Sequence, residues 1–396
     1  MAFSAAGTVD NIKGKSKFIP FSAPLLEKEE IAAVINCINS GWVGTGPVAS
    51  KFEEEFAKFK GVEQAVAVNS CTAALHLSLI ASGVQVGDEV ITTSMTFCST
   101  VNAIIHSGAT PILVDIDFET QNIAPEKIEE KITSKTRAII VVHFAGQVCN
   151  MLEITSLAAK YNLKVIEDCA HAIESKYNGE PAGTLGDFGC FSFYSTKNIT
   201  TIEGGMVISK NLVDLEKIKV LSLHGMNRDA WSRYSSSGFK HYDVVSAGFK
   251  YNMTDVQAAI GIEQLKKIDK FYTIRSSIWN YFIEELGNLP ITLPVYQKSA
   301  NSVHAHHLFT MQIKTNKKKI DRDLFIARMH ENGIGVGVHY KSIPSFSYYQ
   351  NSYGWKEGEW PVSQKIGSST VSLPLSPKLS SENIEHIVRT VQKVLK

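Results

Sequence analysis

The chain has 396 residues, of which 44% are hydrophobic and 20% are charged, and its formal net charge is +1. This length is enough for two domains with a sizeable core. The balanced charge gives no electrostatic footprint for nucleic acid or an anionic membrane, and no apolar run approaches the roughly 18 residues that span a bilayer.

The N-terminal segment and the cysteines both indicate a cytoplasmic protein. The first 17 residues are polar and lack the apolar stretch of a secretory signal. Six cysteines are scattered along the chain without a C-x-x-C pair or a zinc-binding pattern. We therefore expect reduced, mostly buried thiols and no bound metal.

Between about residues 60 and 210, apolar strand-like runs alternate with helix-like runs. Strands are expected at 64–68, 89–93, 111–116, 137–144 and 163–168, and helices at 71–83, 99–108, 124–132 and 151–161. Apolar strands separated by helices indicate a largely parallel sheet covered on both faces. Runs 190–193 and 204–209 follow each other without a helix, so we expect a hairpin and one antiparallel strand there.

The second half of the chain changes its order of elements. A polar stretch at 224–243 is expected to form a long surface loop, and a helical region begins after Thr254, a good N-cap. Farther on, the pattern predicts a smaller α+β domain, with strands at 307–313 and 335–340 and helices near 321–332 and 381–395. We expect three parts: a flexible leader (1–20), a large α/β domain (21–270) and a small domain with its connecting helix (271–396).

Parallel α/β sheets bind ligands beyond the carboxyl ends of their strands, so the residues that follow each strand are the first candidates for a site. Ser70, Cys71 and Thr72 open a helix after the first strand. Free N–H groups and a hydroxyl at a helix start suit a phosphate, although an ordinary N-cap explains them as well when they are taken alone. Phe97 follows the second strand, where an aromatic residue is usually part of the core.

Charged residues end two further strands. Asp168 closes the strand at 163–168, with His171 three residues later, and Lys197 follows 190–193. A carboxylate there is costly unless it is paired or caps a helix. Together, these residues match what pyridoxal phosphate needs. The lysine supplies an amine for the aldehyde, and the carboxylate supplies an acid for the ring nitrogen. The aromatic residue offers a stacking surface, and the helix start offers fixed donors for the phosphate.

A nicotinamide cofactor is the alternative suggested by "GTGPVA" at 44–49. These letters match a dinucleotide-binding fingerprint, but no apolar strand leads into them and Pro47 interrupts them. The structural context that this motif requires is missing, so we set the alternative aside.

The chain resembles the DegT/StrS-type sugar aminotransferases, which are pyridoxal phosphate enzymes of fold type I, the aspartate-aminotransferase-like fold. The resemblance runs from "FIPFSAPLLEKEEI" to the C-terminus and includes "VNSCTAALHLSL", "VIEDCAHAI", "FSFYSTKNITTIEGGM", "GFKYNMTDVQAAIG", "HAHHLF" and "GVGVHY". It implies a mostly parallel mixed sheet with a small C-terminal α+β domain. Among subgroups, the chain is most similar to 4-aminotransferases acting on UDP-linked 4-keto sugars.

The resemblance also implies roles for the reacting residues. Lys197 would bind the cofactor aldehyde as a Schiff base and shuttle protons, and Asp168 would pair with the ring nitrogen. His171 would pack near the ring and its 3′-oxygen, and Phe97 would stack on the ring. A few relatives carry histidine in place of the lysine and are dehydratases, so the lysine favours amino transfer.

The phosphate contacts implied by the resemblance come from two subunits. Cys71 (through its backbone), Thr72 and Ser192 would hold the phosphate within one chain, while Asn252 would reach it from the neighbouring subunit. The resemblance thus implies a homodimer with shared active sites.

For the substrates we expect a nucleotide-linked keto sugar and glutamate as amino donor. "GVGVHYKSI" lacks the arginine that usually clamps an amino acid carboxylate, which favours a sugar site. Arg228 or Arg233 is a candidate for that carboxylate, Lys250 for the diphosphate and His339 for the sugar. A solvated loop charge, a surface lysine and a satisfied strand-end histidine explain the same residues without a ligand.

Three other functions remain open from the sequence. A dehydratase and a 3-aminotransferase would use the same cofactor on a related substrate. A non-catalytic regulator could keep the fold, because fold alone does not dictate function, but it would have no need of Lys197 or Asp168.

Overall fold

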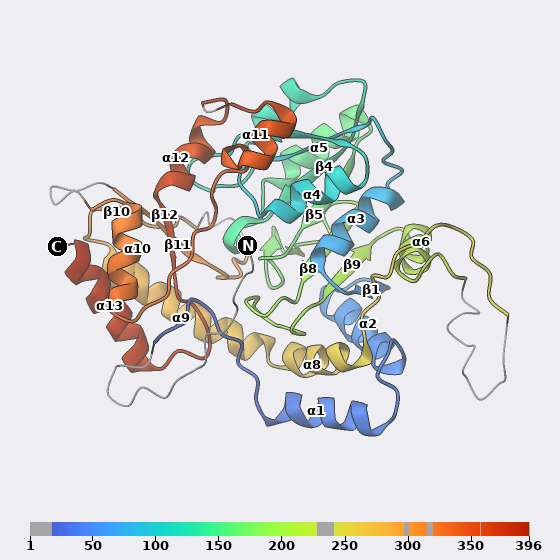
Figure 1. Cartoon of the computed structure of the whole chain (residues 1–396), viewed down its shortest axis with the longest axis horizontal. Coiled ribbons are helices and arrows are strands. Elements are labelled where there is room, and N and C mark those ends of the chain that lie inside the picture. The colour runs from blue at the N-terminus through green and yellow to red at the C-terminus, as the bar shows by residue number, and fades with distance from the viewer. Residues whose placement is uncertain (1–17, 228–240, 297–300, 315–319, 357, 396) are drawn as a thin grey trace, which may run out of the picture.

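The computed structural model describes residues 18–227, 241–296, 301–314, 320–356 and 358–395, and is built around a seven-stranded sheet beside a three-stranded one (Figure 1). The large sheet has the order β1-β9-β8-β5-β4-β2-β3, and only β9 runs against the other strands. Its strands are β1 (Ala65–Val68), β2 (Glu89–Thr93), β3 (Thr110–Val114), β4 (Thr136–Val142), β5 (Lys164–Asp168), β8 (Phe188–Ser192) and β9 (Gly205–Ser209). The expected α/β fold with a mostly parallel mixed sheet is confirmed.

Helices cover both faces of this sheet. Alternate residues of β4 explain why: Ile139 and Val141 point into one core cluster, and Ala138 and Ile140 into the other. Helices α2, α5 and α8 contribute to the first cluster, and α3, α4 and α6 to the second. The bounds are α1 (Lys28–Asn39), α2 (Pro47–Lys60), α3 (Cys71–Ala81), α4 (Cys98–His106), α5 (Met151–Tyr161), α6 (Leu212–Ser222) and α8 (Asp255–Lys266).

Most of the predicted local structure of this unit is present. Strands β8 and β9 form the expected antiparallel pair, and Thr254 caps α8 through a capping box with Gln257. The helix predicted at 124–132 is wrong. Two 3-10 turns, η1 (Pro125–Lys127) and η2 (Glu129–Lys131), occupy this segment, and the backbone is already extended at Ile132. So short a helical pattern is marginal by itself, and its surroundings decide its form.

The glycine-rich stretch before α2 binds a carboxylate of this chain. Asp255 is fully buried, and its Oδ1 accepts hydrogen bonds from the N–H groups of Gly46 (2.7 Å) and Ala49 (2.9 Å), while Oδ2 accepts one from Val48 (3.1 Å). A helix N-terminus attracts an anion, and here the anion is internal. This contact explains the glycines without a dinucleotide.

The smaller unit contains an antiparallel sheet of order β10-β11-β12 and its own core. In Figure 1, α9 links it to the large unit, and α10 and α13 pack beside its sheet. Its strands are β10 (Ile291–Thr292), β11 (Phe309–Ile313) and β12 (Thr370–Leu373). The helices and turns after α8 are α9 (Ile268–Leu286), α10 (Arg322–Glu331), η4 (Ile343–Ser345), α11 (Ser347–Tyr353), α12 (Pro361–Ser369) and α13 (Ser381–Leu395). Three further short elements lie earlier in the chain: η3 (Phe144–Gly146), β6 (Lys176–Tyr177) and β7 (Glu180–Pro181).

The predicted strand at 335–340 is wrong. Only Gly337 pairs in this segment, with Ser372 of β12, and the residues after it bend toward the large sheet. The N-terminal segment also reaches the smaller unit, because Ile19 is buried there and pairs with Ile334. The predicted domain boundary at 270 falls inside α9, a helix shared by both units, and stays a prediction.

The described helices and cysteines were each expected to have one property, the absence of a membrane span and the reduced state. None of these helices combines the length and the apolar character needed to cross a membrane. All six cysteines are free thiols; four are buried, and Cys71 and Cys98 are partly exposed.

Lys60, at the end of α2, is a cation buried against the large sheet. Only 2% of the residue is exposed, its Nζ donates to the carbonyl of Ile173 (3.2 Å), and it lies 4.8 Å from the ring centre of Phe191. Burial lowers the pKa of Lys60 from 10.5 to about 8. The folded protein therefore loses this proton at a lower pH than the unfolded chain.

This difference predicts a pH-dependent stability. Between about pH 8 and 10.5 the unfolded chain binds more protons at Lys60, so the free energy of unfolding rises with pH by about 3 kcal/mol from this group. Lys60→Met removes that increment, whereas Lys58→Met, at an exposed position of the same helix, keeps it. Urea unfolding at pH 7.5 and pH 10.5 measures the difference. An equal pH dependence in the wild type and Lys60→Met would contradict it.

Candidate active site

A cavity of about 680 Å³ lies where β2, β5 and β8 end, and residues of the smaller unit line its other side. Nine residues that the sequence singled out line this cavity together. They are Ser70, Cys71, Thr72, Phe97, Asp168, His171, Ser192, Lys197 and His339. The parallel sheet accounts for most of this grouping, because the carboxyl ends of β2, β5 and β8 meet at one edge.

A closed loop carries Lys197 from the end of β8 into the cavity. Phe193 closes the base of the loop: its N–H donates to the carbonyl of Gly204, and its own carbonyl accepts from the N–H of Thr201 and the hydroxyl of Thr200, each at 2.9 Å. Phe193 is fully buried in the core. The hydroxyl residues near the lysine therefore hold the backbone of the loop in place.

Two glycines allow close approaches around this loop. A Cβ on Gly205 would lie 2.5 Å from the backbone carbonyl carbon of Ser70, and one on Gly204 would lie 2.1 Å from the hydroxyl of Thr201. Neither distance is possible for a real side chain. Gly205 is thus required where the loop meets the start of α3, and Gly204 is required within the loop itself.

Lys197 and Asp168 influence each other within the cavity. Burial lowers the pKa of Lys197 from 10.5 to about 8, although its side chain keeps partial access to the cavity and the Asp168 charge opposes the shift. Burial raises the pKa of Asp168, against hydrogen bonds from Ala170 N–H (3.1 Å) and the Thr100 hydroxyl (2.9 Å) and against the charge of Lys197. The site thus offers an amine that deprotonates readily and a carboxylate with room for another donor.

The start of α3 offers donors for a phosphate. The side chain of Ser70 already accepts from the N–H of Ala73 (3.1 Å), so it caps the helix. The N–H groups of Cys71 and Thr72 have no acceptor within the helix, and both residues line the cavity together with Ser192. This donor set fits the phosphate of pyridoxal phosphate, and the cavity places it near Lys197 and Asp168.

His171 is neutral, and its hydrogen bonds fix its tautomer. Its Nδ1 accepts from the N–H of Ala145 (3.3 Å), so its Nε2 carries the proton and donates to the hydroxyl of Tyr340 (3.0 Å). Burial and the charge of Lys197 hold the pKa of His171 well below its usual range. Tyr340 stacks on this imidazole at an interplanar angle of 15°, and its own proton remains available to a ligand.

His307 has the opposite arrangement of donor and acceptor nitrogens to that of His171. Asn198 donates its side-chain N–H groups to Glu174 (2.7 Å) and to the carbonyl of Ala305 (3.1 Å), so its oxygen faces His307 and accepts from Nδ1 (2.7 Å). Nε2 of His307 is therefore an acceptor. The fully buried Arg275 pairs with Glu174 behind this chain of contacts. Tyr340 and His307 give the cavity one uncharged donor and one uncharged acceptor.

Two of the predicted substrate or cofactor residues do not line this cavity, and two others cannot be placed. Lys250 is exposed, and Asn252 pairs with Val68 at the end of β1. Arg228 and Arg233 lie outside the described residues. A contact from Asn252 to the cavity of a neighbouring subunit stays a prediction.

Sequence reasoning missed four residues that line the cavity: Glu203, His307, Tyr340 and Lys341. All four belong to stretches that the sequence analysis quoted, "FSFYSTKNITTIEGGM", "HAHHLF" and "GVGVHYKSI". Only the fold brings His307 and Tyr340 together, because they lie on separate loops of the smaller unit.

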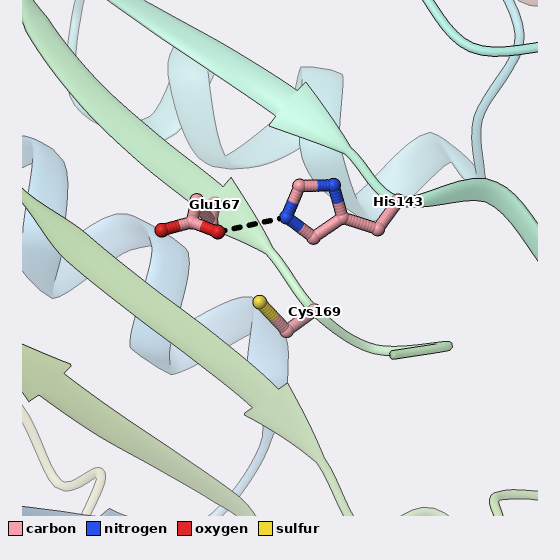
Figure 2. A group of neighbouring side chains, drawn as sticks. All are labelled: His143, Glu167 and Cys169. Atoms are coloured by element: carbon pink, nitrogen blue, oxygen red, sulfur yellow. Dashed lines mark hydrogen bonds and ion pairs between the residues drawn. The ribbon is translucent and has the colours of Figure 1, made fainter. Parts of the chain in front are cut away.

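A second group of polar side chains, His143, Glu167 and Cys169, is buried at the ends of β4 and β5 (Figure 2). His143 accepts from the N–H of Cys149 (3.2 Å) at Nδ1 and donates to Glu167 (2.8 Å) at Nε2, so neither ring nitrogen has a free lone pair. Glu167 also accepts from three backbone N–H groups within 183–186. This cluster connects strand ends by hydrogen bonds and does not fit a metal ion.

The chain is similar to known proteins over nearly its whole length. The model of the DegT/DnrJ/EryC1/StrS aminotransferase family matches residues 24–392. The chain is 42% identical, over 97% of its length and 99% of the relative, to the spore coat polysaccharide biosynthesis protein SpsC of Bacillus subtilis. It is similar in structure to the putative sugar aminotransferase Spr1654 of Streptococcus pneumoniae in its PLP form, with a TM-score of 0.88, 31% identity, and coverage of 96% of this chain and 100% of that chain.

A further solved structure is Helicobacter pylori PseC, an aminotransferase involved in the biosynthesis of pseudoaminic acid. The TM-score is 0.87 at 28% identity, with 96% of this chain and 99% of that chain covered. The family match and the near full-length relatives establish that this chain is a pyridoxal-phosphate-dependent aminotransferase of the DegT/DnrJ/EryC1/StrS aminotransferase family.

Proposed function

We propose that this enzyme transfers an amino group from glutamate to a UDP-linked 4-keto-6-deoxy sugar, and that the amino sugar enters a surface polysaccharide or glycan. The observation that carries the proposal is the joint placement of Lys197, Asp168 and the α3 N-terminus in one cavity that has no arginine among its described lining residues. The likeness to SpsC and PseC, whose names place them in polysaccharide and sugar biosynthesis, supports the sugar substrate.

In this proposal each residue of the cavity has a separate role in binding the cofactor or moving a proton. When bound, pyridoxal phosphate supplies an electron-withdrawing ring that stabilises negative charge on the carbon of the amino donor. Lys197 would hold the cofactor through Nζ, and its free amine would move the proton of the amino donor's reacting carbon. Asp168 would pair with the ring nitrogen and keep it protonated. Phe97, 57% exposed and lining the cavity, offers the stacking face.

The uncharged groups of the cavity suit a sugar. The hydroxyl of Tyr340 can donate and His307 Nε2 can accept, which matches the mixed demands of sugar hydroxyls. Nδ1 of His339 is hydrogen-bonded to the hydroxyl of Ser372 (2.8 Å), and burial lowers the pKa of His339 to about 4, so this histidine also acts as a neutral partner. We retain His339 as a sugar contact and Lys250 as a diphosphate contact from the neighbouring subunit.

A homodimer with shared sites is part of the proposal. Helix α1 exposes Ile31, Ile35 and Ile38 by 60, 51 and 54%, and their spacing places them on one face of the helix. Trp42 and Val43 extend this apolar surface. Surfaces of this kind commonly mark interfaces, and a second copy of the chain would cover this one.

A panel of acceptors tests the proposed function. Enzyme first converted to its amino form by glutamate should regain the yellow colour with UDP-linked 4-keto-6-deoxy sugars, and much more slowly with 2-oxo acids other than 2-oxoglutarate. Absorbance after rapid mixing measures the return. Recovery only with 2-oxo acids would indicate an amino acid aminotransferase. Failure of glutamate to give a stable amino form in the first step would contradict amino transfer.

The lowered pKa of Lys197 predicts how the apoenzyme takes up its cofactor. Only the neutral amine attacks the aldehyde, so the rate of colour development should rise about tenfold per pH unit below pH 8 and level off above it. Stopped-flow absorbance between pH 6 and 10 measures the profile. Lys197→Ala, the control, should develop no covalent colour. A rate that still rises between pH 9 and 10 would contradict the assignment.

Shared active sites can be tested by mixing two inactive variants. Lys197→Ala and Asn252→Ala each impair both sites of their own homodimer. A mixed dimer would contain one site with both substitutions and one intact site. Unfolding and refolding the two variants together should therefore restore about a quarter of wild-type activity. No recovery, with mixed dimers verified by mass spectrometry, would show that Asn252 serves the site of its own chain.

A further inference from the structure

The described lining of the cavity contains two lysines and no arginine. Lys197 is one, and it is engaged by the cofactor in the proposed function. The other is Lys341, on the wall formed by the smaller unit. The three lining histidines, at positions 171, 307 and 339, are neutral at pH 7, because burial holds the pKa of each below its usual range. Among the described lining residues of this chain, Lys341 is therefore the cation that remains for a negatively charged substrate, besides the contact proposed for Lys250 of the neighbouring subunit.

Contacts on both sides fix the backbone around Lys341. On one side, the carbonyl of His339 accepts from Thr370 (3.2 Å) of β12. On the other, Ile343 N–H donates to the carbonyl of Ser94 (2.9 Å), next to the end of β2. Ser342 between them is buried. The backbone of Lys341 is therefore held between the two units at the wall of the cavity.

The ammonium group of Lys341 is held over an aromatic ring. Its Nζ lies 4.9 Å from the ring centre of Phe346, which also lines the cavity. No carboxylate within the described ranges lies at ion-pair distance from it. A cation–π contact orients an ammonium group but leaves its charge available to an anion.

The exposed carboxylate that lines the cavity, Glu203, is far from this point. Glu203 precedes β9 and lies beside the end of β8, whereas Lys341 lies beside the end of β2. Strands β8 and β2 are three places apart in the sheet, or roughly 14 Å at the usual strand spacing. The positive charge of Lys341 is therefore not cancelled by Glu203.

We infer that Lys341 is the anion-binding residue of this cavity and takes either the carboxylate of the amino donor or the diphosphate of the sugar nucleotide. The inference rests on the proposed function for the view that the substrates are anions. Lys341 replaces, from a different position and with a different side chain, the arginine that the cavity lacks. It acts on substrate affinity and takes no part in the proton transfer.

The test compares Lys341→Met with a matched control. Lys365→Met removes another exposed lysine that lies over an aromatic ring, that of Phe118 at 5.6 Å, outside the cavity. Dissociation constants of the holoenzyme for 2-oxoglutarate and for UDP, measured by calorimetry, report each anion without turnover. We expect Lys341→Met to weaken one of them by about tenfold or more, and Lys341→Arg to restore most of it. Added salt should weaken wild-type binding more than binding to Lys341→Met.

The two ligands separate the possible sources of the anion. Weaker binding of 2-oxoglutarate alone assigns the donor carboxylate, and weaker binding of UDP alone assigns the diphosphate. Changes below about twofold for both ligands, or equal losses in Lys365→Met, would overturn the inference. Because neither ligand is the keto sugar, the inference can fail while the proposed amino transfer stands, and the acceptor panel can fail while Lys341 is still shown to bind anions.

Discussion

Two opposite charges, held together where water is partly excluded, determine how this cavity is built. Burial works against both the ammonium group of Lys197 and the carboxylate of Asp168, and each charge offsets part of the penalty of the other. Their proximity follows from the sheet, in which β5 and β8 are neighbours and Asp168 pairs with Cys190, two residues before the end of β8. The lysine loop, closed at Phe193, then brings the amine back over the strand ends.

Around this pair, the histidines have fixed donor and acceptor roles because their hydrogen-bond partners decide which ring nitrogen carries the proton. The N–H of Ala145 makes Nδ1 of His171 an acceptor, and the oxygen of Asn198 makes Nδ1 of His307 a donor. The two imidazoles, with ring centres 4.4 Å apart, therefore present opposite hydrogen-bonding characters. Neutral histidines also avoid repulsion with the nearby lysine, so the cavity keeps its positive charge for the cofactor and the substrate.

Much of the large unit could be predicted from sequence because each strand is apolar and each helix is separated from the next by a turn. The same regularity explains why Asp168 and Lys197 could be assigned to one site: parallel strands end at one edge. The predictions at 124–132 and 335–340 were wrong because tertiary contacts decided the local structure of these segments. Strand β12 (Thr370–Leu373) was not anticipated, since a strand of four residues gives little pattern.

The residues that sequence reasoning missed belong to loops. Tyr340 and His307 reach the cavity from separate segments of the smaller unit, and no spacing in the chain relates them to Asp168. Lys341 is an ordinary lysine in the sequence. Its position at the cavity follows only from the fold, in which Ser94 and Thr370 bind the backbone on either side of it.

The buried carboxylate of Asp255 has a consequence for how the chain is held together. It lies 209 residues after Gly46 in the chain, yet it fills the positive end of α2 as a phosphate would. Removal of this carboxylate would leave the three N–H groups of Gly46, Val48 and Ala49 without their acceptor. The aspartate thus ties the start of α2 to the start of α8, and the two helices hold each other in place across more than half of the chain.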